Sequence, residues 1–180
     1  MKSILKIALY ASLSIVIVVA ALFVWTRWQL HLPSQEAARK QFANHRTEYV
    51  RFVSLLREAP DVRTVDSDGT VDTYTGHARV VPQYRDLMGK IGAKSVLVRE
   101  DGSIEFSIWG FGCTICSDSF MGIRYLPVDH MKQGRPGWVP ILVSSLDSRN
   151  LPHENGSVAN GLYVVRLEPE WFIYRFEYRE

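Results

Sequence analysis

An uncharged apolar run near the start of the chain constrains its fold more than any other feature. The run extends from Ile7 to Trp25, and its 19 residues match the length that a helix needs to cross the hydrocarbon core of a bilayer, about 30 Å thick. Lys2 and Lys6 precede it, and Trp28 follows its far end, where indole rings favour the membrane interface. The pattern predicts a transmembrane helix that acts as a signal-anchor.

A cleaved signal peptide is the alternative, because small residues at Ala20-Ala21 follow an apolar segment of suitable length. The run stays apolar beyond these alanines, with no polar stretch before a cleavage site, which favours an uncleaved anchor over residues 7–26. The basic residues before the run then predict a cytoplasmic tail of residues 1–6. Residues 27–180 are expected to form a periplasmic, extracytoplasmic α+β domain of a single-pass protein in a bacterial inner membrane.

The charge balance argues against a nucleic-acid partner. The chain has 21 Lys and Arg residues and 19 Asp and Glu residues. Two of the lysines precede the apolar run, so the remainder carries 19 basic residues (21 minus 2) against 19 acidic ones and is formally neutral. A neutral domain without a Lys- and Arg-rich stretch has no electrostatic footprint for nucleic acid. Over the whole chain, 47% apolar and 22% charged residues are typical of a globular protein.

Helices are predicted in the first half of the remaining chain. Ser34 is typical of an N-cap, and apolar residues recur at spacings of three and four over residues 38–56. This periodicity predicts one helix that ends before Pro60. A second helix is predicted from Pro82 to Ile91, with Gly92 as its C-terminal cap. The polar, turn-rich residues 61–81 between them are expected to be mostly loop.

The second half predicts an antiparallel sheet. A three-residue turn with Gly102 in the left-handed region pairs Val98 with Ile104 and Val96 with Phe106. This register places the β-branched residues on one face. The predicted strands, about five in all, cover residues 96–99, 104–109, 120–126, 162–167 and 171–178.

Helices followed by strands indicate the α+β class. After the N-terminal transmembrane helix, we expect two helices packed on one face of an antiparallel sheet of about five strands. The alternating aromatic residues of the last strand, Phe172 to Tyr178, are expected to face a core. The stretches SIEFSIWGFG, SFMGIRYLP and EPEWFIYRFE resemble those of small uncharacterised bacterial envelope proteins. The resemblance covers the last half of the chain and implies no activity.

Both cysteines of the chain lie in one C-x-x-C motif, Cys113 and Cys116. A membrane-tethered thiol-disulfide oxidoreductase would use Cys113 as nucleophile and Cys116 as resolving thiol. Thioredoxin-like proteins place this motif between a strand and a helix, and the residues after Cys116 lack a helical pattern.

Two further readings of the cysteine pair stay open. A disulfide requires the strand to end before Cys113, for example at Gly110 and Gly112, because three residues of extended chain span about 10 Å. Alternatively, Cys113 and Cys116 are unpaired and pack as small apolar side chains.

The sequence favours a non-catalytic binding domain over an enzyme. No metal-ligand spacing, phosphate-binding glycine loop or dinucleotide fingerprint is found, so no metal site and no cofactor are expected. The 34-residue segment 127–160 is the expected contact surface, with His130 and Trp138 as candidate binding residues. The predicted partner is an envelope protein or a toxin that the domain neutralises, and the thiol-disulfide oxidoreductase is the alternative.

Overall fold

The structure is a computed structural model that describes residues 16–19, 33–111, 118–127, 140–154 and 157–178. The chain divides into two compact units, Met1–His31 and Leu32–Glu180. Residues 16–19, which are helical, are the described part of the first unit. Every element named below belongs to the second unit.

The described residues include no helix that is both long enough and apolar enough to cross a bilayer. This finding contradicts the prediction of a single-pass inner-membrane protein with a signal-anchor at residues 7–26. The α-helices in the described part of the second unit have 10 or 12 residues. They are therefore at most about 18 Å long, and each has a polar face. Of the predicted anchor, residues 7–15 and 20–26 lie outside the described residues.

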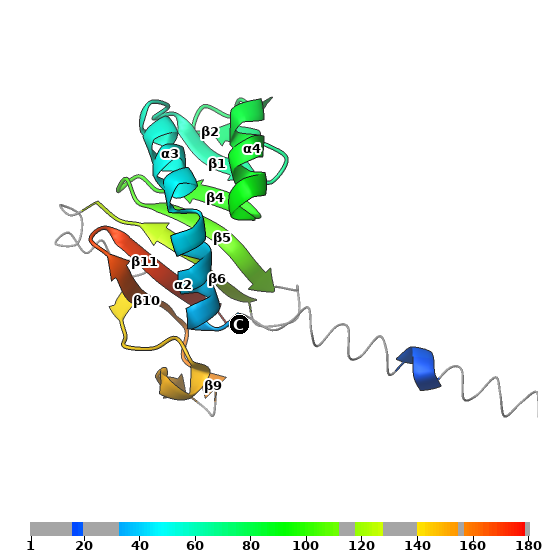
Figure 1. Ribbon diagram of the computed structural model, residues 1–180, viewed down its shortest axis with the longest axis vertical. Helices are drawn as coiled ribbons and strands as arrows, with labels where there is room; N and C mark the ends of the chain where they lie inside the picture. Colours follow the sequence, from blue (N-terminus) through cyan, green and yellow to red (C-terminus); the bar gives the residue numbers. More distant parts are fainter. Residues whose placement is uncertain (1–15, 20–32, 112–117, 128–139, 155–156, 179–180) are drawn as a thin grey trace, which may run out of the picture. The chain divides into compact units, whose positions relative to one another are not determined.

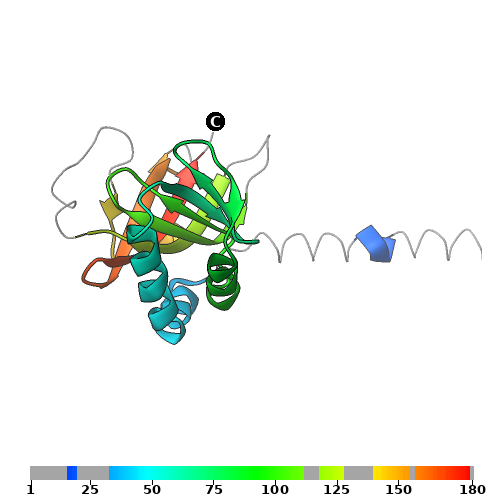
Figure 2. The same ribbon diagram turned by 90° about the horizontal axis from the view of Figure 1, so that it is seen from above.

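Three helices pack on one face of a central sheet: α2 (Gln35–Asn44), α3 (Arg46–Arg57) and α4 (Pro82–Ile91). Figures 1 and 2 show this arrangement from two directions. Helix α4 has the predicted bounds, and Gly92 ends it with a left-handed φ of 63°. The predicted N-cap is also confirmed, because the Ser34 hydroxyl accepts a hydrogen bond from the backbone N–H of Ala37 at 3.2 Å.

The first predicted helix is wrong in one respect, because it is two helices rather than one. His45 separates α2 from α3 with φ −122° and ψ 22°, outside the helical region. Phe42 and Tyr49 lie seven residues apart on either side of this break, and both are buried in the core. The apolar periodicity therefore continues across His45, and a pattern of spacings does not reveal the break.

The central sheet has nine strands in the order β3-β2-β1-β4-β5-β6-β11-β10-β7. Neighbouring strands are antiparallel except β10 and β7, which are parallel, so the sheet is mixed. Strands β8 and β9 pair separately. The bounds are β1 (Val62–Asp66), β2 (Thr70–Thr73), β3 (Arg79–Val80), β4 (Ser95–Val98), β5 (Ile104–Phe111), β6 (Asp118–Tyr125), β7 (Ile141–Leu142), β8 (His153–Glu154), β9 (Ser157–Val158), β10 (Gly161–Glu168) and β11 (Trp171–Tyr178).

The expected fold of two helices on about five antiparallel strands is therefore wrong. The five predicted strands correspond to β4, β5, β6, β10 and β11, but the sheet also contains β1, β2, β3 and β7. Three of these extra strands come from residues 61–81, which were expected to be loop. Their deeply buried apolar residues are Val62, Val65 and Val71. Three valines are too few to make the alternation visible in a polar segment.

The predicted register of the β4–β5 hairpin is confirmed. Val98 pairs with Ile104 and Val96 pairs with Phe106. Gly102 has a left-handed φ of 74°, as the three-residue turn requires. The register directs these four paired side chains toward the helices, since alternate residues of a strand face opposite sides of the sheet.

Aromatic rings fill the space between the helices and the sheet. Tyr49 of α3 is fully buried and contacts Phe106 edge-on, with ring centroids 5.1 Å apart. It also lies 6.0 Å from the ring of Trp171. Phe52 of α3 stacks on Tyr84 of α4 at 5.3 Å and joins the two helices. These contacts fix α3 against the middle of the sheet.

The aromatic residues of β11 are divided between the two faces of the sheet. Trp171 and Ile173 join the main core beneath the helices. Phe172 and Tyr174 are also buried, as predicted for the aromatic stripe, but they belong to a smaller cluster on the opposite face. Tyr178, at the end of the predicted stripe, is 38% exposed.

Replacing Tyr49 with Phe is expected to preserve or increase the free energy of unfolding, by about 1 kcal/mol. The Tyr49 hydroxyl is buried and has no hydrogen-bond partner among the described residues. Tyr163→Phe is the matched control, because the Tyr163 hydroxyl donates to the carbonyl of Ala159 at 2.8 Å. The control is expected to lose about 1 kcal/mol in urea unfolding. Equal losses in both variants would contradict the unpaired state of Tyr49.

Replacing Gly122 with Ala is expected to cost several kcal/mol of stability or to prevent folding. A Cβ atom at this position would lie 1.9 Å from the carbonyl oxygen of Phe106 and 2.9 Å from the Tyr174 ring. Gly89→Ala is the control, because open space surrounds that position in α4. The control is expected to gain about 0.5–1 kcal/mol. A Gly122→Ala variant as stable as the wild type would show that β5 and β6 are not paired as described.

Candidate functional site

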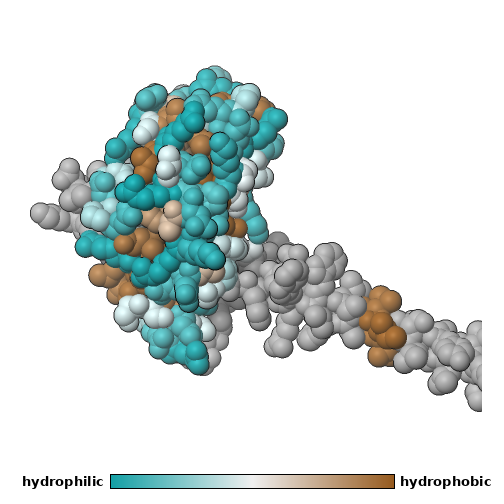
Figure 3. Space-filling view, in the orientation of Figure 1, coloured by the Kyte–Doolittle hydropathy of each residue, from teal (hydrophilic) through white to brown (hydrophobic). Residues whose placement is uncertain are grey.

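Exposed apolar side chains are scattered over the described surface, and the face in Figure 3 is mostly hydrophilic with small separate apolar patches. Tyr74, 49% exposed, differs from the others because it borders a cleft. The cleft has a volume of ≈ 450 Å³. Ligand sites in proteins typically measure about 300–1,000 Å³. We therefore treat this cleft as the candidate functional site.

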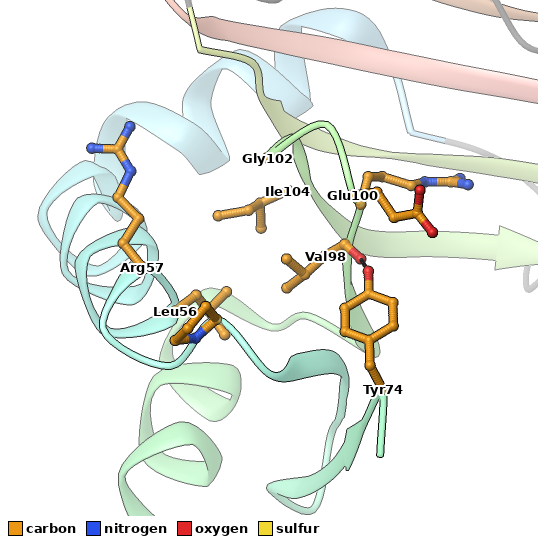
Figure 4. A pocket seen from close by; sticks show the side chains of 9 residues that line it. Leu56, Arg57, Tyr74, Val98, Glu100, Gly102 and Ile104 are labelled. Carbon is orange, nitrogen blue, oxygen red and sulfur yellow. Dashed lines mark hydrogen bonds between the residues drawn. The ribbon is translucent and has the colours of Figure 1, made fainter. Parts of the chain in front are cut away.

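The floor of the cleft is apolar and comes from α3, β4 and β5. Leu56 belongs to the last turn of α3, whereas Val98 and Ile104 are the last pair of the β4–β5 hairpin before its turn. Figure 4 shows these three side chains pointing into the same space from different sides. Leu56 and Ile104 are buried and Val98 is partly exposed.

The cleft exists because α3 ends before it covers the end of the hairpin. The last helical residue is Arg57, and Pro60 follows three residues later and lines the cleft. Proline has no backbone N–H and disfavours helix continuation. The confirmed hairpin register turns Val98 and Ile104 toward the helix layer, and both side chains line the cleft beyond the helix end.

Tyr74 forms one wall of the cleft. It directly follows β2, and its hydroxyl donates a hydrogen bond to the carbonyl oxygen of Val98 at 3.0 Å. This bond connects the chain after β2 to the end of β4. The phenol ring is thereby held beside the apolar floor while about half of its surface remains in contact with solvent.

Arg57 stands on the opposite side of the cleft (Figure 4). Its guanidinium lies over the ring of Tyr125, 5.0 Å from the centroid, and donates a hydrogen bond to the Tyr125 hydroxyl. The Tyr125 hydroxyl in turn donates to a carboxylate oxygen of Glu170 at 3.1 Å. Burial raises the pKa of Tyr125 above its usual value, an effect that Arg57 opposes and Glu170 reinforces. Tyr125 is therefore neutral at pH 7 and orients Arg57.

Arg99 also lines the cleft, but its charge is directed to the other face of the sheet. Its Nη2 lies 2.9 Å from a carboxylate oxygen of Glu105, whose side chain is 9% exposed. The same carboxylate lies 3.4 Å from Nη1 of the buried Arg124, and Nη2 of Arg124 donates to the Ser103 hydroxyl at 3.1 Å. Two guanidinium groups thus share one carboxylate on the face opposite the helices.

The arrangement of side chains is suited to non-covalent binding. An apolar floor excludes water from a bound apolar group, and Tyr74 and Arg57 offer an aromatic face and hydrogen-bond donors at its edges. Within the described residues, no group of three or more His, Cys, Asp or Glu side chains is placed to hold a metal ion.

The residues that the sequence singled out as site candidates are not among the described residues. Cys113 and Cys116 fall in residues 112–117, and His130 and Trp138 fall in residues 128–139, both outside the described residues. The described residues therefore test none of the four, and their roles stay predictions.

Sequence reasoning did not identify Arg57, Tyr74 or Tyr125 as site residues. Arg57 has the ordinary place of a basic residue in the last turn of a helix. Tyr74 lies in a segment predicted to be loop, and Tyr125 lies in a predicted strand. The one available signal was Pro60, which limits the length of α3 and so marks where the helix layer ends.

The fold and the cleft together define an α+β domain with a mixed nine-stranded sheet and an apolar cleft at the end of one helix. Compared with known proteins, the chain matches no family model, no curated protein and no solved structure.

Replacing Tyr125 with Phe is expected to lower the free energy of unfolding by about 1 kcal/mol, because Arg57 and Glu170 lose their shared hydroxyl. The ring under the guanidinium remains, so Tyr125→Leu is expected to cost more. Urea unfolding measures both losses. Two variants of equal stability would show that the ring contributes nothing to holding Arg57.

Proposed function

We propose that this chain is a binding protein whose cleft accepts an apolar side chain of a protein partner. The observation that carries the proposal is a cleft of ≈ 450 Å³ that Leu56, Val98 and Ile104 line from different sides. Binding is favourable when a matching apolar group displaces water from the apolar surface of a concave site. A binding site of this kind requires no catalytic residues.

The composition of the cleft edge favours a protein partner over a small molecule. Tyr and Arg are enriched among the residues that dominate binding energy in protein interfaces. Tyr74 and Arg57 occupy the two sides of the cleft, both exposed, with Pro60 also exposed at its border. Their positions are fixed by hydrogen bonds to Val98 and Tyr125. Such ordered contact residues lose little conformational entropy when a partner binds.

The thiol-disulfide hypothesis for Cys113 and Cys116 lacks comparable support. Strand β6 begins at Asp118, where a thioredoxin-like site would have a helix. The binding proposal therefore predicts that replacing both cysteines with serine leaves partner binding unchanged.

The proposal is tested by selecting peptides from a random seven-residue library on the full-length chain. Enriched peptides are expected to carry a large apolar residue and to bind Tyr74→Ala and Val98→Ala at least tenfold more weakly than the wild type. Val80→Ala and Leu142→Ala are matched controls, because these side chains are 52% and 67% exposed and do not line the cleft. They are expected to bind normally.

Two outcomes would overturn the proposal. One is that no peptide is enriched on the wild-type chain. The other is that enriched peptides bind Tyr74→Ala and Val98→Ala as tightly as the wild type while the melting temperatures show that all variants are folded. The Cys113→Ser, Cys116→Ser double variant serves as a further control, and a loss of binding there would favour a role for the thiols.

A further inference from the structure

The arginine beside the cleft differs from the ion-paired arginines of the described surface in what it contacts. Arg46 pairs with Glu168 at 3.0 Å, and Arg149 pairs with Asp147 at 2.7 Å. Arg57, in contrast, contacts the ring and the hydroxyl of Tyr125, which is a neutral group. Among the described residues, no carboxylate forms an ion pair with Arg57.

The Arg57 guanidinium is also held in place before any partner arrives. The ring of Tyr125 supports it, and Glu170 orients the Tyr125 hydroxyl. Glu170 is itself fixed, because its backbone carbonyl accepts a hydrogen bond from the N–H of Leu126 at 2.7 Å. A guanidinium has five N–H donors in a rigid plane, and Tyr125 accepts from one of them. The exposed side chain of Arg57 is therefore a preorganised cation at the edge of an apolar site.

We propose that Arg57 binds a carboxylate of the partner, so that the partner segment is an acidic peptide with Asp or Glu close to its apolar anchor residue. This inference rests on the proposed function of the cleft and specifies the chemistry of its partner. A planar guanidinium matches the geometry of a carboxylate, and the resulting hydrogen bonds are charge-assisted. The apolar floor between Leu56 and Ile104 takes the neighbouring apolar side chain.

Two arginines with different surroundings make the inference specific to one residue. Arg99 already shares the carboxylate of Glu105 and projects from the opposite face of the sheet, so it is not the expected anchor. Arg51 lies on the same helix as Arg57, is exposed, and does not line the cleft. Arg51→Gln therefore removes the same charge from the same helix and is the matched control for Arg57→Gln.

The experiment uses peptides enriched on the full-length chain and two synthetic variants of each. In one variant the acidic residues become Asn or Gln, and in the other the large apolar residue becomes Ala. The acid-to-amide change is expected to weaken binding to the wild type and to Arg51→Gln by tenfold or more. The same acid-to-amide change is expected to alter binding to Arg57→Gln less than threefold, because this variant has no guanidinium for the carboxylate to bind.

The outcomes distinguish the inference from the proposed function. If the apolar-to-Ala change weakens binding but the acid-to-amide change does not, the cleft binds its partner and the role of Arg57 is refuted. If neither change matters, both proposals fail. A further test is competition for peptide binding. If millimolar inorganic phosphate displaces the peptide and acetate does not, Arg57 binds a phosphate group, and the proposal that it binds a carboxylate is refuted.

Discussion

The edge-on contact of α3 with β5 is the interaction on which the rest of the domain depends. Tyr49 and Phe52 both meet the ring of Phe106, at 5.1 and 5.5 Å, and so set the position of the helix on the sheet. Leu56 follows Phe52 by one helical turn, and Ile104 precedes Phe106 by two residues on the same face. The cleft is therefore the continuation of this contact beyond the point where the helix ends.

The chemistry of the cleft follows from which face each side chain occupies. Arg57 projects from the helix end and rests on Tyr125, which faces the helices. Arg99 lies one residue beyond Val98, so its guanidinium reaches the other face and pairs with Glu105. One arginine thus remains available at the cleft, while the other stabilises the buried charges beneath the sheet. A shift of one residue in the hairpin would exchange the two faces.

The sequence predicted the elements that are set by local patterns of residues. It missed strands β1 to β3 and the cleft, which depend on contacts between residues distant in the chain. The bounds of α4, the Ser34 cap and the β4–β5 register follow from caps, turns and periodicity, and all three are confirmed. Strands β1 to β3 were missed because they bury few apolar residues and join the sheet only through the pairing of β1 with β4. The cleft was missed because it is a space between elements, and no periodicity describes a space.

The central claim, that the cleft is the binding site, is tested most directly by methyl NMR of the full-length chain during titration with a library-selected peptide. The account predicts the largest chemical-shift changes at the methyl groups of Leu56, Val98 and Ile104. Methyl groups on the opposite face of the sheet, such as those of Val164, are expected to stay nearly unchanged. Largest changes on that opposite face, with the cleft methyl groups unaffected, would contradict the account.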